Sequence, residues 1–453
     1  MAPIETFPTG VPGLDRILGG GLPRLSFNIV AGDPGGGKTT LAHQIVFANA
    51  TEAQRALYVT VVGEPPVKML RYQQRFPFYD PDRVGRAVHY RNLSVEAMAG
   101  DLDVVLERIR RFVEELEPSM VVVDSFRSVV RLTRPSERNV AEVQTFVQRL
   151  ATDLARWEAT TFLVGEFREE ETPINPVFTV ADGLFWLRQH REGDGRVRKL
   201  EVSKLRGGAE LPGRHVYRIG DDGVRVYPRR IEELDPVEGR EAAPGRVSLG
   251  VPTLDELMGG GACRGDAVVV SGPSGCGKSI LATQFVGEGL TQGETCVVAL
   301  FEEGRERYLE RSDELGLDLR EAEEDGRLRL LVREALDLSV DETFEDIRDA
   351  VEELGATRVV VDSLSGLQVV AAGSEAKRLR QAMSRVVRTL VRAGVTVVLT
   401  AELHQHMDEL RFTPYESSFL ADDIVLMRYV EIRGELQSAL SIIKMRRSSH
   451  SRA

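Results

Sequence analysis

The chain is 453 residues long, more than one ordinary hydrophobic core accommodates, so we expect two large domains. Apolar residues make up 42% and charged residues 28% of the sequence, which is typical of a soluble globular protein. The net charge of −12 at pH 7 argues against a large nucleic-acid-binding surface, because neutralising phosphates requires a surplus of Lys and Arg.

The N-terminal segment Met1–Gly10 has neither the basic stretch nor the apolar stretch of a secretory signal. No apolar run reaches the roughly 18 residues that a transmembrane helix requires. We therefore expect a cytoplasmic protein with no membrane-spanning segment. The three cysteines, Cys263, Cys276 and Cys296, form no Cys-x-x-Cys pair and predict neither a disulfide framework nor a zinc site.

In the first half of the chain, short β-branched runs alternate with amphipathic segments. We expect buried strands at Leu25–Ala31, Ala56–Val62, Met120–Asp124 and Thr160–Gly165, and helices at Leu41–Ala50, Leu102–Glu117 and Asn139–Trp157. Continuous apolar strands that alternate with helices indicate an α/β fold with a parallel sheet covered on both faces. Three later segments, GLFWLRQ, RKLEVSKLR and HVYRIGDDGVRVYP, predict antiparallel strands that close the domain.

A phosphate-binding loop follows the first of these strands. Its sequence GDPGGGKT matches G-x-x-x-x-G-K-[ST] and lies between a predicted strand and a predicted helix, as the motif requires. Glycines let backbone N–H groups turn toward phosphates, the lysine reaches the β- and γ-oxygens, and the threonine hydroxyl binds Mg²⁺. The candidate residues for binding ATP and Mg²⁺ are Gly32, Gly35, Gly36, Gly37, Lys38, Thr39 and Thr40.

The chain repeats itself at an offset of 240 residues. Residues 11–39 read VPGLDRILGGGLPRLSFNIVAGDPGGGKT, and residues 251–279 read VPTLDELMGGGACRGDAVVVSGPSGCGKS. Two homologous domains therefore account for almost the whole chain. We expect the first at residues 1–227 and the second at residues 247–453. The segment between them, residues 228–246, is rich in Pro, Gly and charge and predicts a linker.

The second copy contains its own phosphate-binding loop, GPSGCGKS. The same chemistry applies, with Lys278 in place of Lys38 and Ser279 in place of Thr39. The candidate nucleotide-binding residues of this loop are Gly272, Ser274, Gly275, Cys276, Gly277, Lys278, Ser279 and Ile280. Cys276 lies inside the loop, where its oxidation could block nucleotide binding, but a small buried side chain is the simpler interpretation.

Each copy also has an aspartate at the end of an apolar strand, Asp124 in MVVVDSF and Asp362 in VVVDSL. We expect both to help hold Mg²⁺ together with Thr39 and Ser279, by orienting a magnesium-bound water. The alternative is a helix N-cap at a strand–helix turn.

Hydrolysis requires a group that orients or deprotonates the attacking nucleophile. Glu302 and Glu303 follow the apolar strand Cys296–Phe301, and Glu302 is 24 residues past Lys278. The same count from Lys38 reaches Val62 and Gly63, so the first copy lacks both carboxylates. Glu64 lies one place beyond. The sequence therefore predicts the better-equipped catalytic site in the second domain.

Basic pairs recur late in each copy, Lys204 and Arg206 in the first and Lys444 and Arg446 in the second. Because they alternate on a predicted strand, both members of a pair face the same side. Exposed basic residues without a role are the simple alternative. Their duplication at the offset of the phosphate loops favours a finger that reaches the γ-phosphate in a neighbouring subunit.

These motifs together strongly resemble the KaiC family of the RecA superfamily, over essentially the whole chain. The matching segments are GVPGLDRILGGG, both phosphate loops, ALFEEGRERYL, VVVDSLSGL, YVEIRGEL, KLRG and KMRRSSH. The resemblance implies two tandem RecA-like P-loop NTPase domains, each with a mostly parallel central sheet and helices on both faces. It implies a double-ringed homohexamer with ATP at the subunit interfaces and slow ATP hydrolysis. In the clock protein of this family, the second ring is also an autokinase and autophosphatase.

By position, the resemblance makes Glu302 the group that activates a phospho-acceptor hydroxyl or water, and the four basic residues the fingers in trans. Two departures matter. Where the clock protein has an adjacent Ser-Thr phosphorylation pair, this chain has Ser418 and Phe419, so we expect Ser418, with Ser417 beside it, as the candidate acceptor. The chain also stops at Ala453, without the long tail that binds the clock protein's activating partner, so timekeeping through that partner is not expected.

Three functions remain open on the sequence alone. The first is an ATPase that autophosphorylates in its second domain, and the second is an ATP-switched assembly scaffold without kinase activity. The third, a nucleic-acid motor, needs basic or aromatic loops in a pore, and Arg127–Arg138 is basic in one copy only. We also expect a regulatory protein partner, which the residues do not identify.

Overall fold

The computed structural model contains two compact units, residues 1–230 and residues 231–453. The structure describes residues 4–61, 66–98, 102–126, 145–146, 148–150, 152–153, 156, 158–172, 177–192, 195–229, 245–333, 340–364, 374–403 and 421–446. Among these residues, no helix is both long enough and apolar enough to cross a bilayer.

The first unit consists of a nine-stranded sheet, a short two-stranded sheet and the helices around them. Its strands are β1 (Thr6–Phe7), β2 (Leu22–Pro23), β3 (Phe27–Gly32), β4 (Ala56–Thr60), β5 (Val88–Asn92), β6 (Met120–Asp124), β7 (Thr160–Gly165), β8 (Gly183–Glu192), β9 (Gly195–Leu205), β10 (Arg214–Gly220) and β11 (Gly223–Tyr227). Its helices are α1 (Leu14–Ile17), α2 (Lys38–Asn49), α3 (Pro66–Gln73), α4 (Ser94–Met98), α5 (Leu102–Leu116) and α8 (Val177–Val180), with 3₁₀ turns η1 (Pro81–Arg83) and η2 (Glu169–Glu171).

The second unit has a seven-stranded sheet and a two-stranded sheet. Its strands are β12 (Arg246–Val247), β13 (Ala262–Cys263), β14 (Ala267–Gly272), β15 (Cys296–Leu300), β16 (Leu328–Val332), β17 (Arg358–Asp362), β18 (Thr396–Glu402), β19 (Asp423–Ile432) and β20 (Glu435–Met445). Its helices are α9 (Pro252–Leu257), α10 (Lys278–Thr291), α11 (Arg305–Glu314), α12 (Leu319–Glu324), α13 (Val340–Leu354) and α15 (Ser374–Arg392).

The two large sheets share one topology. The strand order is β11-β10-β9-β8-β3-β7-β6-β4-β5 in the first and β16-β15-β17-β18-β14-β19-β20 in the second. The strands from β8 to β5 in the first order are parallel, as are those from β16 to β19 in the second. The remaining strands, β9, β10, β11 and β20, are antiparallel.

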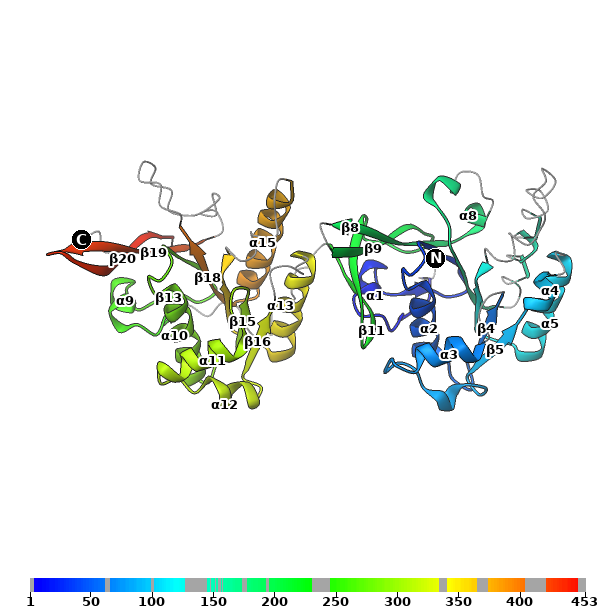
Figure 1. The fold of residues 1–453 in the computed structure, drawn as a ribbon, viewed down its shortest axis with the longest axis horizontal. Helices are drawn as coiled ribbons and strands as arrows, with labels where there is room; N and C mark the ends of the chain where they lie inside the picture. The colour runs from blue at the N-terminus through cyan, green and yellow to red at the C-terminus, as the bar shows by residue number, and fades with distance from the viewer. Residues whose placement is uncertain are drawn as a thin grey trace. The chain divides into compact units, whose positions relative to one another are not determined.

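Each sheet has helices on both faces (Figure 1). In the first unit, one face packs against α5 and the other against α2. In the second unit, one face packs against α13 and α15 and the other against α10 and α11. The strands are buried on both sides, which explains why their sequences are continuous apolar runs rather than alternating ones. The predicted α/β fold with a mostly parallel sheet is confirmed.

The helix α5 shows how the pattern specifies its own packing. Its buried residues follow helical spacing and form one apolar stripe: Val105, Leu106, Ile109, Phe112, Val113 and Leu116. The charged residues lie on the opposite side. The predicted span Leu102–Glu117 differs from the observed helix by one residue, whereas most of the predicted helix Asn139–Trp157 lies outside the described residues.

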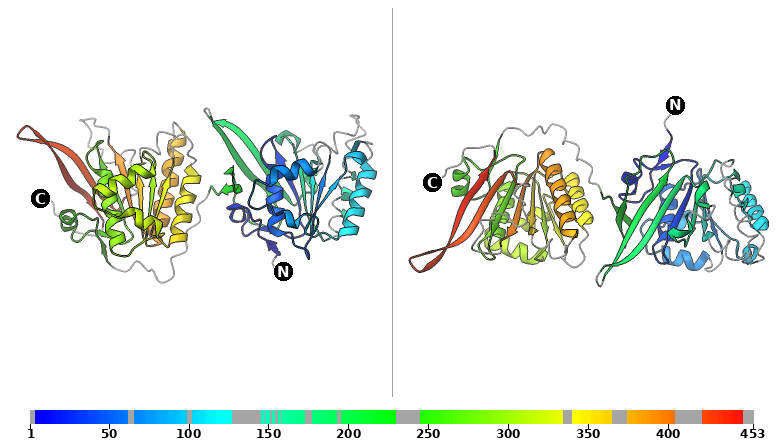
Figure 2. Two further views of the ribbon diagram at one scale, coloured as in Figure 1. Left: turned by 60° about the horizontal axis from the view of Figure 1, so that its bottom comes forward. Right: turned by 90° about the horizontal axis from the view of Figure 1, so that it is seen from above.

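Long antiparallel hairpins end the parallel part of each sheet. The hairpin β8–β9 follows the central strands of the first unit, and β19–β20 follows those of the second. Both hairpins extend beyond the body of their own unit (Figure 2). The predicted antiparallel segments of the first copy correspond to β8, β9 and the pair β10–β11. In the sheet, β10 pairs with β9, and β11 pairs with β10.

Candidate functional site

The candidate site of each unit lies where the parallel strands end. In an open α/β sheet, loops that follow the carboxyl ends of the strands gather at one edge, and ligands bind there. The phosphate loops follow β3 and β14, which are interior strands of their sheets. Asp124 ends β6 and Asp362 ends β17, so both aspartates lie at the same edge as the loops.

The first phosphate loop turns through glycines that adopt left-handed backbone conformations. Gly35 has φ 72° and Gly37 has φ 82°, values that a side chain disfavours. The Lys38 ammonium donates to the carbonyl oxygens of Gly32, at 3.1 Å, and Asp33, at 2.7 Å, so it lies over the loop. The predicted loop residues, Gly32, Gly35, Gly36, Gly37, Lys38, Thr39 and Thr40, all lie between the end of β3 and the first turn of α2.

The second phosphate loop has the same conformation. Gly275 has φ 78° and Gly277 has φ 101°, and Lys278 donates to the carbonyl oxygen of Pro273 at 2.7 Å. Neither α2 nor α10 has an acidic residue in its first turn, so the N-terminal N–H groups and the helix dipole remain favourable for an anion. The predicted residues, Gly272, Ser274, Gly275, Cys276, Gly277, Lys278, Ser279 and Ile280, lie between the end of β14 and the first turn of α10, and Cys276 is buried.

In the first unit, Asp124 is held by two hydroxyl groups. Thr39 Oγ1 donates to Asp124 Oδ2 at 2.7 Å, and Tyr58 OH donates to the same oxygen at 2.8 Å. Burial raises the pKa of Asp124, opposed by these two hydrogen bonds and by the Lys38 charge. Burial lowers the pKa of Lys38, and the negative charges of Glu166 and then of Asp124 oppose this shift. A buried carboxylate beside a threonine hydroxyl fits the ligand set that Mg²⁺ prefers.

In the second unit, Asp362 is held from a different side. Thr400 Oγ1, on β18, donates to Asp362 Oδ1. Among the described residues, Ser279 makes no hydrogen bond to Asp362, although Ser279 follows Lys278 in the first turn of α10 as Thr39 follows Lys38 in α2. The two units therefore present the same residue types for a magnesium ion and orient the aspartate with different partners.

The paired glutamates of the second unit have separate partners. Ser363, next to Asp362, donates its hydroxyl to Glu302 Oε1, so Glu302 lies at the end of β15 beside the strand-end aspartate. Glu303 accepts two hydrogen bonds from Arg311, both at 2.6 Å, and forms a largely buried ion pair with it. The geometry thus distinguishes the two carboxylates: Glu302 lies beside Asp362 and accepts from Ser363, and Glu303 is bound by Arg311.

Several predicted residues lie outside the described residues. These are Val62, Gly63 and Glu64, which replace the glutamates in the first unit, and the candidate phospho-acceptors Ser417 and Ser418. The basic segment Arg127–Arg138 also lies outside them.

The basic pairs lie near the beginning of the strand that leads to the phosphate loop of their own unit, at the opposite end of that strand from the loop. Arg206 forms an ion pair with Asp182, whose other carboxylate oxygen accepts from the backbone N–H of Phe27, the first residue of β3. Lys204 donates to the carbonyl oxygen of Thr179 at 3.2 Å. Since the phosphate loop follows the last residue of β3, this pair is separated from it by the length of the strand.

The second unit repeats this arrangement. Arg446 forms an ion pair with Asp422, which also accepts from the backbone N–H of Ala267, the first residue of β14. Lys444 donates to the carbonyl oxygen of Ala421 at 2.6 Å. Burial lowers the pKa of both lysines, followed by the charge of the neighbouring arginine.

Sequence reasoning did not find four residues at the site edge. Tyr58 and Thr400 donate to the strand-end aspartates. Glu166 follows β7, the strand next to β3, and Glu402 ends β18, the strand next to β14. Glu402 pairs in register with Gly272 of the second loop. A usable signal existed for the two glutamates, because VGE and TAE both end buried strands with a carboxylate. No local pattern indicates Tyr58 or Thr400.

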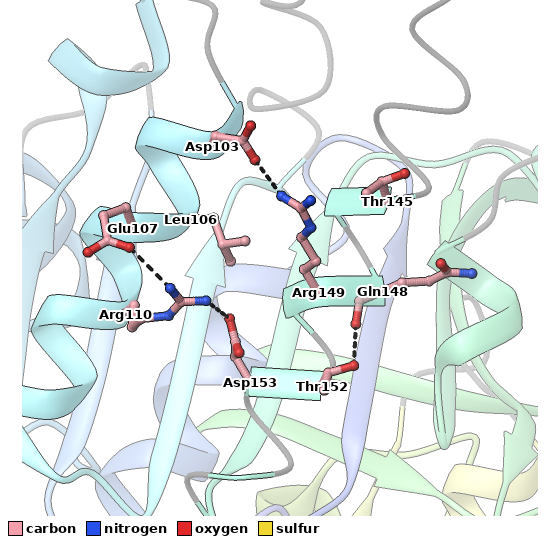
Figure 3. A pocket seen from close by; sticks show the side chains of 9 residues that line it. All are labelled: Asp103, Leu106, Glu107, Arg110, Thr145, Gln148, Arg149, Thr152 and Asp153. Carbon is pink, nitrogen blue, oxygen red and sulfur yellow. Dashed lines mark hydrogen bonds and ion pairs between the residues drawn. The ribbon is translucent and has the colours of Figure 1, made fainter.

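A groove of about 630 Å³ lies elsewhere, between α5 and the described residues that follow position 144 (Figure 3). Its charged side chains pair with one another. Asp103 pairs with Arg149 at 3.0 Å, and Arg110 pairs with Glu107 at 3.2 Å and with Asp153 at 2.7 Å. The groove therefore presents charges that are already compensated, unlike the phosphate loops.

Comparison with known proteins agrees with this geometry. The family model for the KaiC ATPase matches residues 7–231 and again residues 247–453. The circadian clock oscillator protein KaiC of Parathermosynechococcus lividus is 28% identical over 98% of this chain and 82% of its own length. In Synechocystis sp., KaiC 1 is 28% identical and the circadian clock protein KaiC3 is 27% identical, each over 99% of this chain. The chain therefore belongs to the KaiC family of ATPases and consists of two tandem RecA-like P-loop NTPase domains.

Proposed function

We propose that this protein binds ATP with Mg²⁺ at both domains and hydrolyses it slowly, chiefly in the second domain. The observation that carries the proposal is the position of Glu302. Its carboxylate is held by Ser363, directly beside Asp362, at the sheet edge that bears the second phosphate loop. A positioned carboxylate at this place can accept the proton of an attacking hydroxyl or water.

The remaining residues of the site have complementary roles. The loop N–H groups and Lys278 bind the phosphates, as Lys38 does in the first domain. Thr39 with Asp124, and Ser279 with Asp362, would hold the magnesium ion, which neutralises phosphate charge when bound. Glu303 stabilises the site through Arg311, and we assign it a supporting role in keeping the loop after β15 in place.

The same proposal extends to a homohexamer with ATP between subunits. Lys204 and Arg206, and equally Lys444 and Arg446, lie at the sheet edge opposite their own phosphate loop. Such residues cannot reach the γ-phosphate of an ATP bound in their own unit. We propose that they serve as fingers in trans in a KaiC-like ring, to which a regulatory protein binds.

The test uses turnover measured against binding. We expect Glu302→Gln to lower ATP hydrolysis by the second domain by roughly 10²-fold or more, because general base catalysis contributes about that much. Binding of a fluorescent ATP analogue to the second domain should remain. Lys278→Ala should remove binding to the second domain and most of the turnover, whereas Lys38→Ala should leave most turnover in place.

Robust hydrolysis by Lys278→Ala would contradict the assignment of catalysis to the second domain. Unchanged hydrolysis by Glu302→Gln would contradict the role of Glu302. Native mass measured with and without ATP reports the hexamer in the same samples.

We further propose that the second domain autophosphorylates. If Glu302 activates a hydroxyl as well as water, incubation with γ-labelled ATP labels the wild-type protein but neither Ser418→Ala nor Glu302→Gln. Ser417→Ala is the matched control, since it changes the adjacent hydroxyl. An ATP-switched scaffold without kinase activity is the alternative, and it predicts ATP-dependent assembly with no label on any variant.

A further inference from the structure

Tyr58 is a buried side chain that contacts Asp124 at the proposed magnesium site of the first domain. Its hydroxyl donates to Asp124 Oδ2 at 2.8 Å, and Thr39 donates to the same oxygen at 2.7 Å. The Tyr58 side chain is fully buried in β4, so its hydroxyl is directed at Asp124 rather than at solvent. Such a buried phenol usually has a specific hydrogen-bond partner, and here the partner is the strand-end aspartate.

The orientation of Tyr58 is fixed by its neighbours. Its ring stacks on His43, with centroids 4.2 Å apart and an interplanar angle of 27°. His43 in turn donates from Nδ1–H to the carbonyl oxygen of Thr39 at 2.7 Å, since a carbonyl can only accept. Tyr90 packs on the other strand neighbour, in register with Tyr58. The aromatic cluster thus connects Asp124 and the start of α2.

The second domain achieves the same support with other residues. The offset of 240 places Val298 at the position of Tyr58, and Val298 has no hydroxyl to donate. There the donor is Thr400, on the strand at the other side of the aspartate. In the first domain that other side is Val164, which pairs with Asp124 and cannot donate either. Each domain therefore provides one strand-borne hydroxyl to the aspartate, from opposite neighbours.

We propose that Tyr58 in the first domain and Thr400 in the second are positioning residues for the magnesium ion, acting through Asp124 and Asp362. The inference rests on the proposed binding of ATP with Mg²⁺ at both domains. A hydroxyl that holds the aspartate fixes the direction in which its free electron pairs face. In the first domain it also keeps the Thr39 O–H directed at Asp124, so that the lone pairs of Thr39 Oγ1 remain for the metal.

The test separates magnesium affinity from nucleotide affinity. In a Lys278→Ala background, which confines ATP to the first domain, binding of a fluorescent ATP analogue is followed as Mg²⁺ is titrated. We expect Tyr58→Phe to raise the Mg²⁺ concentration for half-maximal binding by roughly tenfold, as losses of groups that orient metal ligands do. Affinity for the analogue at saturating Mg²⁺ should change by less than about twofold, because no group that touches the phosphates is altered.

Tyr90→Phe is the matched control. Tyr90 belongs to the same aromatic cluster, and its hydroxyl has no hydrogen-bond partner among the described residues. Its removal should leave the Mg²⁺ titration unchanged, so a general loosening of the cluster would appear in both variants and would overturn the proposal. An unchanged titration in Tyr58→Phe would overturn it as well.

A second variant covers the case in which Tyr58→Phe does not fold. In a Lys38→Ala background, Thr400→Val introduces the residue type that the first domain has at that place, and we expect a similar shift in the Mg²⁺ titration of the second domain. If neither background shows Mg²⁺-dependent nucleotide binding before any further change, the proposed function itself fails. That result differs from a normal titration that the tyrosine and threonine variants do not move.

Discussion

His43 lies fully buried under the first phosphate loop, where the second domain has Thr283. Its Nδ1–H donates to Thr39, and burial lowers its pKa to about 4, opposed by that hydrogen bond. The ring is therefore neutral at pH 7. In the second domain, Thr283 faces Arg311, which is paired with Glu303. The first domain thus has a histidine in an aromatic cluster where the second domain has a threonine beside an ion pair.

The neutral state of His43 makes the stability of the first unit depend on pH. An unfolded histidine has a pKa near 6.5, so between about pH 6.5 and pH 4 the unfolded state binds more protons than the folded one. Stability therefore falls as pH falls through this window, by about 3 kcal/mol at most. Urea unfolding followed by tryptophan fluorescence measures it, because both tryptophans, Trp157 and Trp186, belong to the first unit.

His43→Thr, which introduces the residue of the second domain, should flatten this dependence even if it lowers stability overall. A variant that keeps the wild-type slope between pH 6.5 and pH 4 would show that other groups cause it.

Single residues of the site were predictable where a motif fixes their spacing. The phosphate loops, Asp124 and Glu302 follow from residue type and from position after an apolar strand. Tyr58 and Thr400 could not be found in this way, because each acts across a pair of neighbouring strands. Strand order is a property of the folded sheet. The number of residues between Tyr58 and Asp124 in the sequence does not show that their strands are neighbours.

At the scale of elements, the strand β10 supports the first phosphate loop. Tyr217 OH donates to the carbonyl oxygen of Gly36 at 2.5 Å, and Ile219 lies against Gly37, where a Cβ would approach its Cδ1 to 2.4 Å. The segment was predicted as antiparallel strands, and that prediction is confirmed. Its contact with a loop about 180 residues earlier in the chain was not predictable from local pattern.

Tyr217→Phe tests this support. Loss of one buried hydrogen bond costs about 0.5–1.5 kcal/mol and leaves the Gly36 carbonyl without its donor, so we expect ATP binding at the first domain to weaken roughly two- to tenfold. The Mg²⁺ requirement should stay unchanged, in contrast to Tyr58→Phe. Both quantities come from nucleotide binding in the Lys278→Ala background, and an unaltered affinity would show that β10 does not support the loop.

Element boundaries show the same division between local and tertiary causes. The strands Met120–Asp124 and Thr160–Gly165 were predicted to the residue, because buried β-branched runs end abruptly at polar residues. The helix α2 begins at Lys38 rather than at the predicted Leu41. Its start is set by the left-handed Gly37 at the N-cap, not by the first apolar residue of the periodic pattern.

At the scale of the whole molecule, the two units share a topology and differ in their buried charge. Asp423 begins β19 and is almost fully buried, next to Asp266. At the matching places the first unit has Gly183 and Ser26, and the amide of Asn28 donates to the Ser26 hydroxyl at 2.8 Å. Burial raises the pKa of Asp423 to about 7, followed by the carboxylates of Asp266 and Asp422 and opposed by Arg246.

This difference predicts opposite responses of the two units to pH. Between about pH 4 and pH 7 the folded second unit binds the Asp423 proton that the unfolded chain has lost, so its stability falls as pH rises, by about 4 kcal/mol at most. The second unit contains no tryptophan. Its unfolding in urea therefore changes the circular dichroism signal but not the tryptophan fluorescence, which identifies its transition. Asp423→Asn should raise that midpoint at pH 8 and flatten its pH dependence, while the fluorescence transition of the first unit stays where it was. A second-unit midpoint that keeps its wild-type fall with pH in Asp423→Asn would assign the effect to other carboxylates. A shift of both transitions together would instead mean that the two units unfold as one.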